Sequence, residues 1–440
     1  MLKSTRRDFV KGASSLALGA AFASPALIEA ARAWAAESPW KPEDGAKLRM
    51  LRWKRFVQSE GEAFQASLDA FTKATGVEIR LDSEGFEDLR PKAAVAANIG
   101  SGPDVIWGIH ADAHLYPDAM LDITDVCDHL GGKYGGWYPI AEHYGKGRDG
   151  KWINLPITIS GNLINYRKSM VQKAGFDKIP DNTADFLKLF QNLKKNGSPG
   201  GFALGNASGD GNCWTHWILW SHGGRVVDEN DNVVVNSPET VAGLEYVKEL
   251  GENFVQGTAS WLDGHNNKAF LQGACSVTNN GISIYAAAVR EGMKDVAEDM
   301  DHAFYPVGPV GEPTEFHVAF PMMPYKHTKY PNAVKALLAW LMEKEQYDAF
   351  LQGSVGYLSH SLKAFQEHPV WTEDPKRTVF RDVAQRSRSF AHSGTLGYAA
   401  STVFADFVVV NMVAEVATGA RSPQDAAKRA QKRAERYYKV

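Results

Sequence analysis

The sequence is poor in cysteine and carries little net charge. Its 440 residues include 3 cysteines, Cys127, Cys213 and Cys275, which are widely spaced and form no Cys-x-x-Cys pair. This pattern does not support a zinc or iron–sulfur site, and we expect buried thiols, or at most one disulfide with one cysteine left over. The formal net charge of -3 indicates neither a nucleic-acid-binding surface nor an acidic tail.

Motifs of common hydrolases are also missing. The chain has no Gly-x-Ser-x-Gly or His-Glu-x-x-His sequence. Glu60 and Glu62 are paired carboxylates, but two acids at the start of a helix usually complement its dipole and are not a glycosidase pair. After the N-terminal segment we find no run of about twenty apolar residues that would span a membrane. We therefore expect no enzymatic activity, no cofactor and no membrane span.

The N-terminus has the pattern of an export signal. Thr5-Arg-Arg-Asp-Phe-Val-Lys11 is a twin-arginine motif, an apolar run follows from Gly12 to Ile28, and Ala33-Trp34-Ala35 is a small-x-small cleavage site. We predict a twin-arginine signal peptide over residues 1–36 and a periplasmic mature chain. No cysteine lies near the cleavage site, so we expect no lipid anchor.

The next hundred residues alternate between strand and helix patterns. Strands are predicted over 47–56, 77–81 and 103–107, with helices over 62–75 and 91–98 between them. This alternation predicts a parallel sheet flanked by helices, with ligands beyond the carboxyl ends of the strands. At 440 residues the chain should contain two domains or more. The loops after Phe56 and Trp107 are the first candidates for binding.

The segment 151–168 has the features of a chain that crosses between two lobes. Its apolar residues alternate with polar ones, and Pro156 cannot donate to a sheet, so the strand should be broken or at an edge there. Small polar residues, Thr158, Ser160 and Asn162, would then lie at the bottom of a cleft. An ordinary kinked core strand is the alternative. The stretches 307–313 and 354–361 are further candidate crossings.

Aromatic residues are frequent, with 12 Trp in the chain. Trp214, Trp217 and Trp220 recur at i, i+3 and i+6, on one side of a helix. Such a stripe is more often core than ligand platform. We expect Trp220 in the core and Trp214 facing the cleft, where an indole could pack against a sugar ring.

His110, Asp112 and His114 form an alternative, metal-binding candidate. Their period-two spacing would place all three side chains on one face of a strand, and imidazole with carboxylate suits zinc or iron. Pro117 follows closely, however, and a turn into a helix would scatter the three groups.

Several segments in order resemble the extracellular solute-binding proteins of ABC importers, in the sugar-binding family that includes maltose-binding protein. They are Phe71-Thr-Lys-Ala-Thr-Gly76, Gly102-Pro-Asp-Val-Ile-Trp107, Leu155-Pro-Ile157, Leu163-Ile-Asn-Tyr-Arg-Lys168, Ala269-Phe-Leu-Gln-Gly273, Asn279-Asn-Gly281 and Thr418-Gly-Ala-Arg-Ser-Pro423. The resemblance implies a two-lobed α/β periplasmic-binding-protein fold, each lobe a sheet flanked by helices. It places residues 45–156 and 305–355 in an N-terminal lobe and residues 157–304 and 356–440 in a C-terminal lobe.

The resemblance also implies a function and a set of ligand-facing residues. The protein would be a monomer that binds a sugar, oligosaccharide or polyol between its lobes and delivers it to the membrane subunits of an ABC permease. The residues carried over by position are Gln58, Glu60, Trp107, His110, Asp112, Ser160, Asn162, Trp214, Trp217, Trp261, Asn280, Gly281 and Tyr398.

One departure from the family pattern concerns the ligand. Family members commonly read Asn-Gly-Pro-Trp where this chain reads Asn280-Gly-Ile-Ser283, so a stacking aromatic is missing and Tyr285 lies two residues on. This puts a maltodextrin ligand in doubt. An anionic or polyamine solute stays an alternative, because Arg52, Lys54 and Arg55 near the first loop could face an anion, although charges there are more often solvated.

Overall fold

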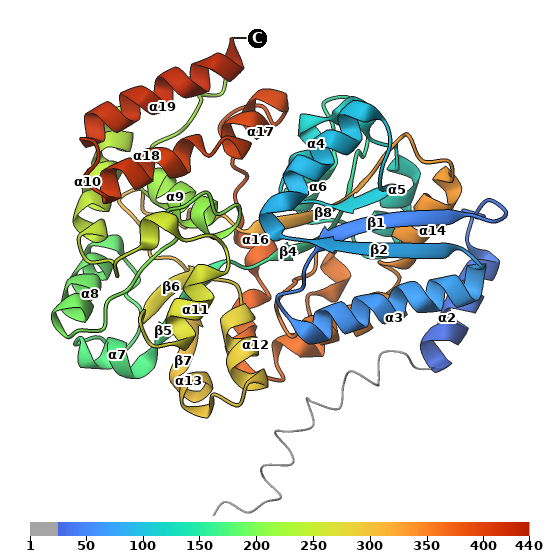
Figure 1. Ribbon diagram of the computed structural model, residues 1–440, viewed down its shortest axis with the longest axis horizontal. Coiled ribbons are helices and arrows are strands. Elements are labelled where there is room, and N and C mark those ends of the chain that lie inside the picture. The colour runs from blue at the N-terminus through green and yellow to red at the C-terminus, as the bar shows by residue number, and fades with distance from the viewer. Residues whose placement is uncertain (1–24, 440) are drawn as a thin grey trace, which may run out of the picture.

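The computed structural model describes residues 25–439 and shows two α/β lobes side by side (Figure 1). The first lobe is built on a five-stranded sheet of order β2-β1-β3-β8-β4, and the second on a three-stranded sheet of order β6-β5-β7. The strands are β1 (Lys47–Trp53), β2 (Glu78–Glu84), β3 (Val105–Trp107), β4 (Leu155–Ser160), β5 (Leu163–Arg167), β6 (Val277–Asn280), β7 (Met300–Ala303) and β8 (Val318–Pro324). The predicted two-lobed fold class is confirmed.

The first sheet is mixed, where the strand–helix alternation predicted a parallel one. β1 pairs in parallel with β2 and β3, but β8 returns from late in the chain and pairs antiparallel with β3 and β4. β4 is the edge strand, and its register shifts between Leu155 and Thr158. Pro156 lies at that shift, as expected for a residue that cannot donate to the ladder.

Helices cover both sheets (Figure 1). Those on the side of the first sheet are α2 (Pro25–Glu37), α3 (Gln58–Thr75), α4 (Leu89–Ile99), α5 (Thr124–Lys133), α6 (Pro139–Gly145), α14 (Pro331–Trp340), α15 (Lys344–Ser354) and α16 (Val383–Arg386). Those on the side of the second are α7 (Lys168–Lys173), α8 (Thr183–Lys195), α9 (Asp210–Ser221), α10 (Pro238–Gly251), α11 (His265–Leu271), α12 (Ser283–Arg290), α13 (Lys294–Asp299), α18 (Val408–Ala417) and α19 (Pro423–Tyr438), with α17 (Tyr398–Ala405) between the lobes.

The helix starts follow local capping rules. Ser237 accepts a hydrogen bond from the Thr240 backbone before α10, and Ser422 accepts one from the Asp425 backbone before α19. Both helices have Pro at their first position, where no N–H is needed. These two starts were predicted from the sequence.

The chain crosses between the lobes immediately after β4, at Gly161 and Asn162. We expected the crossing at residue 157, but β4 stays in the first sheet as far as Ser160. A Cβ atom at Gly161 would lie 2.7 Å from Phe380 Cδ1, so the close approach of the two segments requires glycine here.

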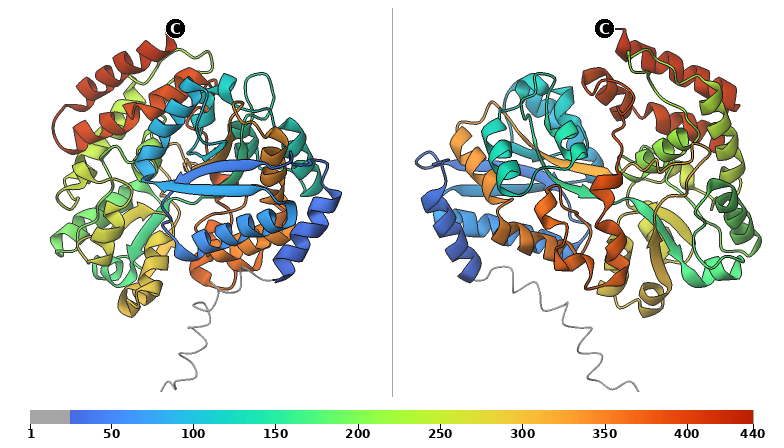
Figure 2. Two further views of the ribbon diagram at one scale, coloured as in Figure 1. Left: turned by 45° about the vertical axis from the view of Figure 1, so that its right-hand side comes forward. Right: turned by 180° about the vertical axis from the view of Figure 1, so that it is seen from behind.

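The later return to the second lobe also differs from the predicted boundary at residue 356. Ser359 bridges Ile159 and Leu362 bridges Trp137, so this stretch continues along the first lobe. Further on, Lys376 donates to the Met300 carbonyl of β7 at 2.6 Å and Asp374 accepts from Tyr285 at 2.7 Å. Seen from behind in Figure 2, residues 356–386 (orange to red) run along the junction of the lobes. They contact both lobes before α17–α19 pack on the second.

One stretch, Tyr398–Ala417, is long and apolar enough to be compared with a membrane span, contrary to our sequence expectation. It consists of α17 and α18, which are interrupted at Phe407, a residue with φ of 54°. Its most apolar window is 56% buried, and α18 packs against α9, α10 and α19. The apolar residues of this stretch are used in the core of the second lobe.

Cys127, Cys213 and Cys275 are free and buried. This agrees with the expectation of buried thiols and not with that of one disulfide.

Helix α2 covers part of the predicted signal peptide. The twin-arginine motif lies outside the described residues, but residues 25–37 pack against α3. Leu27 and Ala31 are buried, and the Trp34 ring lies 6.1 Å from Phe71 and 5.7 Å from Trp340. Cleavage after Ala35 would remove these contacts and expose apolar surface.

We therefore predict that a chain beginning at Pro25 is more stable than one beginning at Glu37. The loss of buried Leu27 and of the Trp34 contacts should lower the free energy of unfolding by about 2–4 kcal/mol. Denaturant titration of the two chains would measure the difference, with Trp34→Ala in the longer chain as an intermediate case. Equal stability would show that α2 contributes nothing to the mature fold.

Candidate functional site

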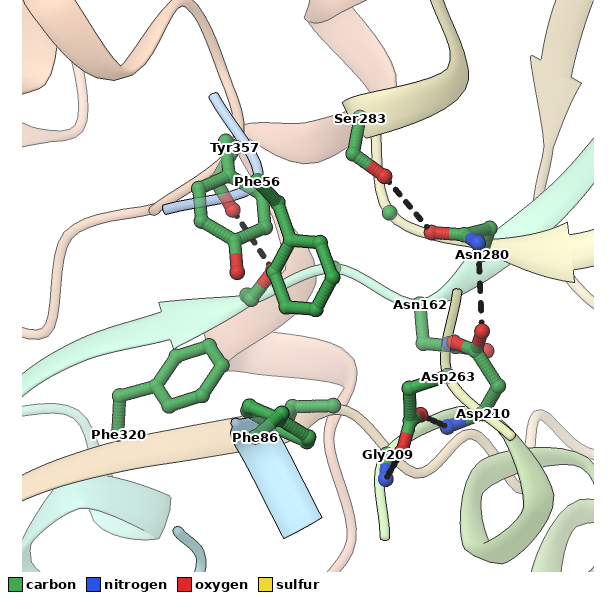
Figure 3. A pocket seen from close by; sticks show the side chains of 14 residues that line it. Phe56, Phe86, Asn162, Gly209, Asp210, Asp263, Asn280, Ser283, Phe320 and Tyr357 are labelled. Carbon is green, nitrogen blue, oxygen red and sulfur yellow. Dashed lines mark hydrogen bonds between the residues drawn. The ribbon is translucent and has the colours of Figure 1, made fainter. Parts of the chain in front are cut away.

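A cavity lies between the two lobes, at the point where the chain first crosses (Figure 3). It encloses about 380 Å³ of space between atoms, a volume that includes the part open to solvent. Its wall is formed by Phe56, Phe86, Ser160, Gly161, Asn162, Gly209, Asp210, Asp263, Asn280, Gly281, Ser283, Val318, Phe320 and Tyr357.

Four aromatic rings form the wall on the side of the first lobe. Phe56 and Phe86 follow the carboxyl ends of β1 and β2, Phe320 lies on β8, and Tyr357 follows α15. The ring centroids of Phe56 and Phe86 are 5.7 Å apart, and those of Phe320 and Tyr357 are 6.4 Å apart. The parallel strands end at the same edge of the sheet, which brings the first two rings together.

Amide and carboxylate groups form the wall on the side of the second lobe. Asp210, in the first turn of α9, accepts hydrogen bonds from Asn162 at 2.7 Å, from Asn266 at 2.7 Å and from Asn280 at 3.2 Å. The three amides come from the crossing segment, α11 and β6. Asp210 thus ties together three segments that are distant in the sequence.

Asp263 lies beside Asp210 and is held by the start of α9. Its carboxylate accepts from the backbone N–H groups of Gly209 at 3.0 Å and Asp210 at 2.6 Å, where the helix dipole favours negative charge. Burial nevertheless raises the pKa of the Asp263 carboxyl to about 6. Burial, and then the neighbouring charge of Asp263, raise the pKa of Asp210 well above its ordinary value.

Among the described residues of the cavity wall there is no Lys, Arg or His. Arg52, which we considered as an anion contact, is buried and donates to Glu60 at 2.8 Å, and Lys54 and Arg55 are exposed. The wall therefore offers no positive charge to an anionic solute.

Four of the predicted site residues line this cavity together: Ser160, Asn162, Asn280 and Gly281. Ser160, the last residue of β4, donates to the Tyr357 carbonyl at 2.7 Å, and Asn162 donates to Asp210 at 2.7 Å. Both belong to the crossing segment. Thr158, which the sequence placed at the cleft floor with them, is fully buried and does not line the cavity.

The structure does not place the predicted tryptophans on the cavity wall. Trp107, Trp214 and Trp217 are fully buried in the lobe cores. Their indole N–H groups donate to the backbone carbonyls of Phe320, Ala203 and Pro306. Trp261 is half-buried and packs near Gly201. The helical stripe is core along its length because α9 is buried on all sides in the second lobe.

The two predicted residues that follow β1 also lie elsewhere. Gln58 begins α3, is exposed and donates to Glu62. Glu60 points into the first lobe toward Arg52. Tyr398 is 56% exposed and borders a separate surface hollow with His114 and Arg148.

His110, Asp112 and His114 do not converge. His110 stacks on Phe316, Asp112 pairs with Arg90 at 2.8 Å, and His114 lies 2.9 Å from the Tyr144 carbonyl. Within residues 25–439 no group of three or more His, Cys, Asp or Glu side chains is arranged to hold a metal ion. The residues form a 3-10 turn from Asp112 to Leu115, which scatters their side chains as the alternative interpretation expected.

Sequence reasoning missed Phe56, Phe86, Phe320, Tyr357, Asp210 and Asp263 as wall residues. The rule that ligands lie beyond the carboxyl ends of parallel strands pointed to the loop at Phe56, and the same rule applies to Phe86 after β2. Asp210 is the first residue of α9 and Asp263 lies in the loop before α11, and their approach to Asn280 depends on the tertiary fold.

Comparison with known proteins gives consistent matches. A family model described as bacterial extracellular solute-binding protein matches residues 66–379. A protein of Brucella abortus named as a binding protein is 22% identical over 215 residues, 48% of this chain and 51% of that protein. One of Deinococcus radiodurans named as an ABC transporter-binding protein is 23% identical over 200 residues, 44% of this chain and 47% of that protein. The chain thus spans about half the length of the curated relatives it matches.

Solved structures match over nearly the whole fold. The GacH receptor of Streptomyces glaucescens, solved unliganded and with acarbose, has a TM-score of 0.75 and 20% identity, covering 90% of this chain and 99% of that one. A sugar transporter protein of Arthrobacter chlorophenolicus with laminaribiose has a TM-score of 0.74 and 18% identity, covering 89% and 99%. An ABC transporter solute-binding protein of Agrobacterium radiobacter with ribitol has a TM-score of 0.70 and 20% identity, covering 90% and 100%.

Proposed function

Because this chain belongs to the family of bacterial extracellular solute-binding proteins, we propose that it binds a small saccharide or polyol between its lobes and delivers it to an ABC permease. The observation that carries the proposal is the two-sided cavity, with four aromatic rings from one lobe and a network of carboxylates and amides from the other. The binding involves no chemical step.

The two walls match the two surfaces of a polyhydroxylated molecule. Its C–H groups pack on aromatic rings, while its hydroxyls donate to Asp210 and Asp263 and accept from amides such as Asn280. Three structural relatives were solved with acarbose, laminaribiose and ribitol, which supports this class of solute.

The arrangement also supports binding by closure of the lobes. Wall residues come from both lobes. Only Gly161 and Asn162 separate β4 of the first sheet from β5 of the second, so this crossing segment is short. Rotation about such crossings would open the cavity, and closure would remove the solute from water and strengthen its hydrogen bonds. Export by the twin-arginine route, a periplasmic location and a monomeric state complete the proposal.

Calorimetric titration against monosaccharides, disaccharides and sugar alcohols tests the function. We expect saturable binding of at least one member, and replacement of Phe56 by Ala should weaken it about tenfold because a stacking ring is lost. Val95→Ala, at a side chain that is 57% exposed on α4, is the matched control and should bind as the unaltered protein does. No heat of binding from any member of the panel would contradict the proposal.

A further inference from the structure

The cavity wall contains two buried carboxylates and no balancing cation. Asp210 and Asp263 are 5% and 7% exposed, and the charge of Glu87 acts on both. Three other buried acids have a basic partner: Glu60 pairs with Arg52, Asp112 with Arg90 and Glu315 with Arg386. Asp104 instead accepts from the Arg49 backbone N–H at 2.7 Å. A buried carboxylate without such a partner is costly. The wall is therefore electrostatically incomplete.

We propose that the solute supplies the missing charge, as a protonated nitrogen that lies against Asp210 and Asp263 while its hydroxyl-bearing carbon skeleton lies against the aromatic wall. The solute class is thus an amino sugar or an amino polyol. This inference rests on the proposed function, since it concerns the same cavity and adds a charge to a polyhydroxylated solute.

The aromatic wall supports the same assignment. A cation within about 6 Å of an aromatic ring is attracted to the ring face, and more strongly when water is excluded. Phe56, Phe86, Phe320 and Tyr357 are mutually close, so a solute in this small cavity lies within reach of several rings. An amide–carboxylate network alone would serve a neutral polyol, but the rings and the uncompensated acids together favour a cation.

Ionisation of the carboxylates gives the proposal a pH dependence. Burial raises the pKa of Asp263 to about 6, so in the free protein the carboxyl gains a proton as the pH falls through 6. A bound cation favours the ionised form, and binding should therefore release protons and weaken as the pH is lowered from 7 to 5. The other titratable groups that act on the two acids are Glu87, Cys213, Tyr305 and Tyr357. Burial raises the pKa of the last three groups, which keeps them neutral in this range.

The test compares matched solutes in calorimetric titrations of the protein over residues 25–439. Glucamine and glucitol differ only in one amine for one hydroxyl, and glucosamine and glucose form a second pair. At pH 7 we expect the amine of at least one pair to bind about tenfold more tightly than its hydroxyl partner, because a charged hydrogen bond is the stronger one. The preference should shrink at pH 5.

Two variants test whether the preference for amines arises at Asp263. Asp263→Asn retains an oxygen acceptor for the Gly209 and Asp210 N–H groups, and it should weaken amine binding about tenfold more than hydroxyl binding. Asp181→Asn removes a charge from a side chain that is 82% exposed, and it should leave the preference unchanged.

The outcomes separate this inference from the proposed function. Equal binding of amine and hydroxyl solutes, or tighter binding of the hydroxyl solutes, would overturn the inference and leave the sugar- or polyol-binding function standing. If putrescine, a cation without hydroxyls, were the only solute to bind, the site would still be shown to bind a cation. The proposal that the solute is polyhydroxylated would be overturned. An amine preference that Asp263→Asn leaves intact would place the nitrogen elsewhere and overturn the assignment to this wall.

Discussion

Replacement of Asp210 by Ala should lower solute affinity by more than about 100-fold, the largest effect of any single change in the cavity wall. Three amides, those of Asn162, Asn266 and Asn280, lose their common acceptor. Each unpartnered buried donor costs about 1–3 kcal/mol, and the crossing segment, α11 and β6 lose the group that sets their relative positions. The free energy of unfolding should also fall, by about 3 kcal/mol.

Titration with glucitol and glucamine, together with denaturant unfolding, would measure both effects. Asp210→Asn keeps the size of the side chain and one acceptor oxygen, so its loss of affinity should be intermediate. Asp181→Ala, at an exposed position, controls for the removal of a carboxylate. Solute affinity of Asp210→Ala within threefold of the unaltered protein would show that the network does not organise the site.

Replacement of Arg52 by Ala should cost about 3–5 kcal/mol of stability, the largest expected effect on folding. The Arg52 and Glu60 side chains are 4% and 0% exposed and their ion pair is 2.8 Å long. The guanidinium lies 4.7 Å from the Trp107 ring centroid and 5.0 Å from that of Trp53. Without Arg52, the Glu60 carboxylate would remain buried, uncompensated and surrounded by aromatic rings.

A double variant distinguishes lost charge balance from lost packing. In Arg52→Met with Glu60→Leu both charges are removed and apolar volume is retained, so most of the stability should return. Denaturant unfolding of the single and double variants gives the comparison, with each lobe followed by its own probe because two lobes need not unfold in one step. A double variant as unstable as Arg52→Ala would contradict this explanation.

Local rules accounted for much of the fold. The periodicity of residues 47–107 predicted a sheet covered by helices, and Pro156 predicted the irregularity at an edge strand, because a residue without an N–H interrupts any ladder. The antiparallel strand β8 and the crossing at Gly161 were not predictable in the same way. Their positions depend on pairing between residues more than 150 positions apart, such as Ile106 with Met323.

The candidate site shows the same division. The family resemblance placed Trp107, Trp214 and Trp217 at the ligand, yet their indoles fill the lobe cores, where large apolar rings with one satisfied N–H are most stabilising. Phenylalanine and tyrosine form the wall instead. Only the packing of the two lobes in the structure shows which rings remain beside open space.

The sequence by itself determined the α/β class, the small polar residues of the crossing segment and the balance of charge, because these follow from local periodicity and composition; the division into two lobes was implied by the family resemblance. The tertiary structure decided which carboxylates share one wall. Asp210 and Asp263 are more than 50 residues apart, and their proximity results from loops that meet at the start of α9, where backbone N–H groups and the amide of Asn280 converge. Proximity of this kind depends on long-range packing, which no local pattern encodes.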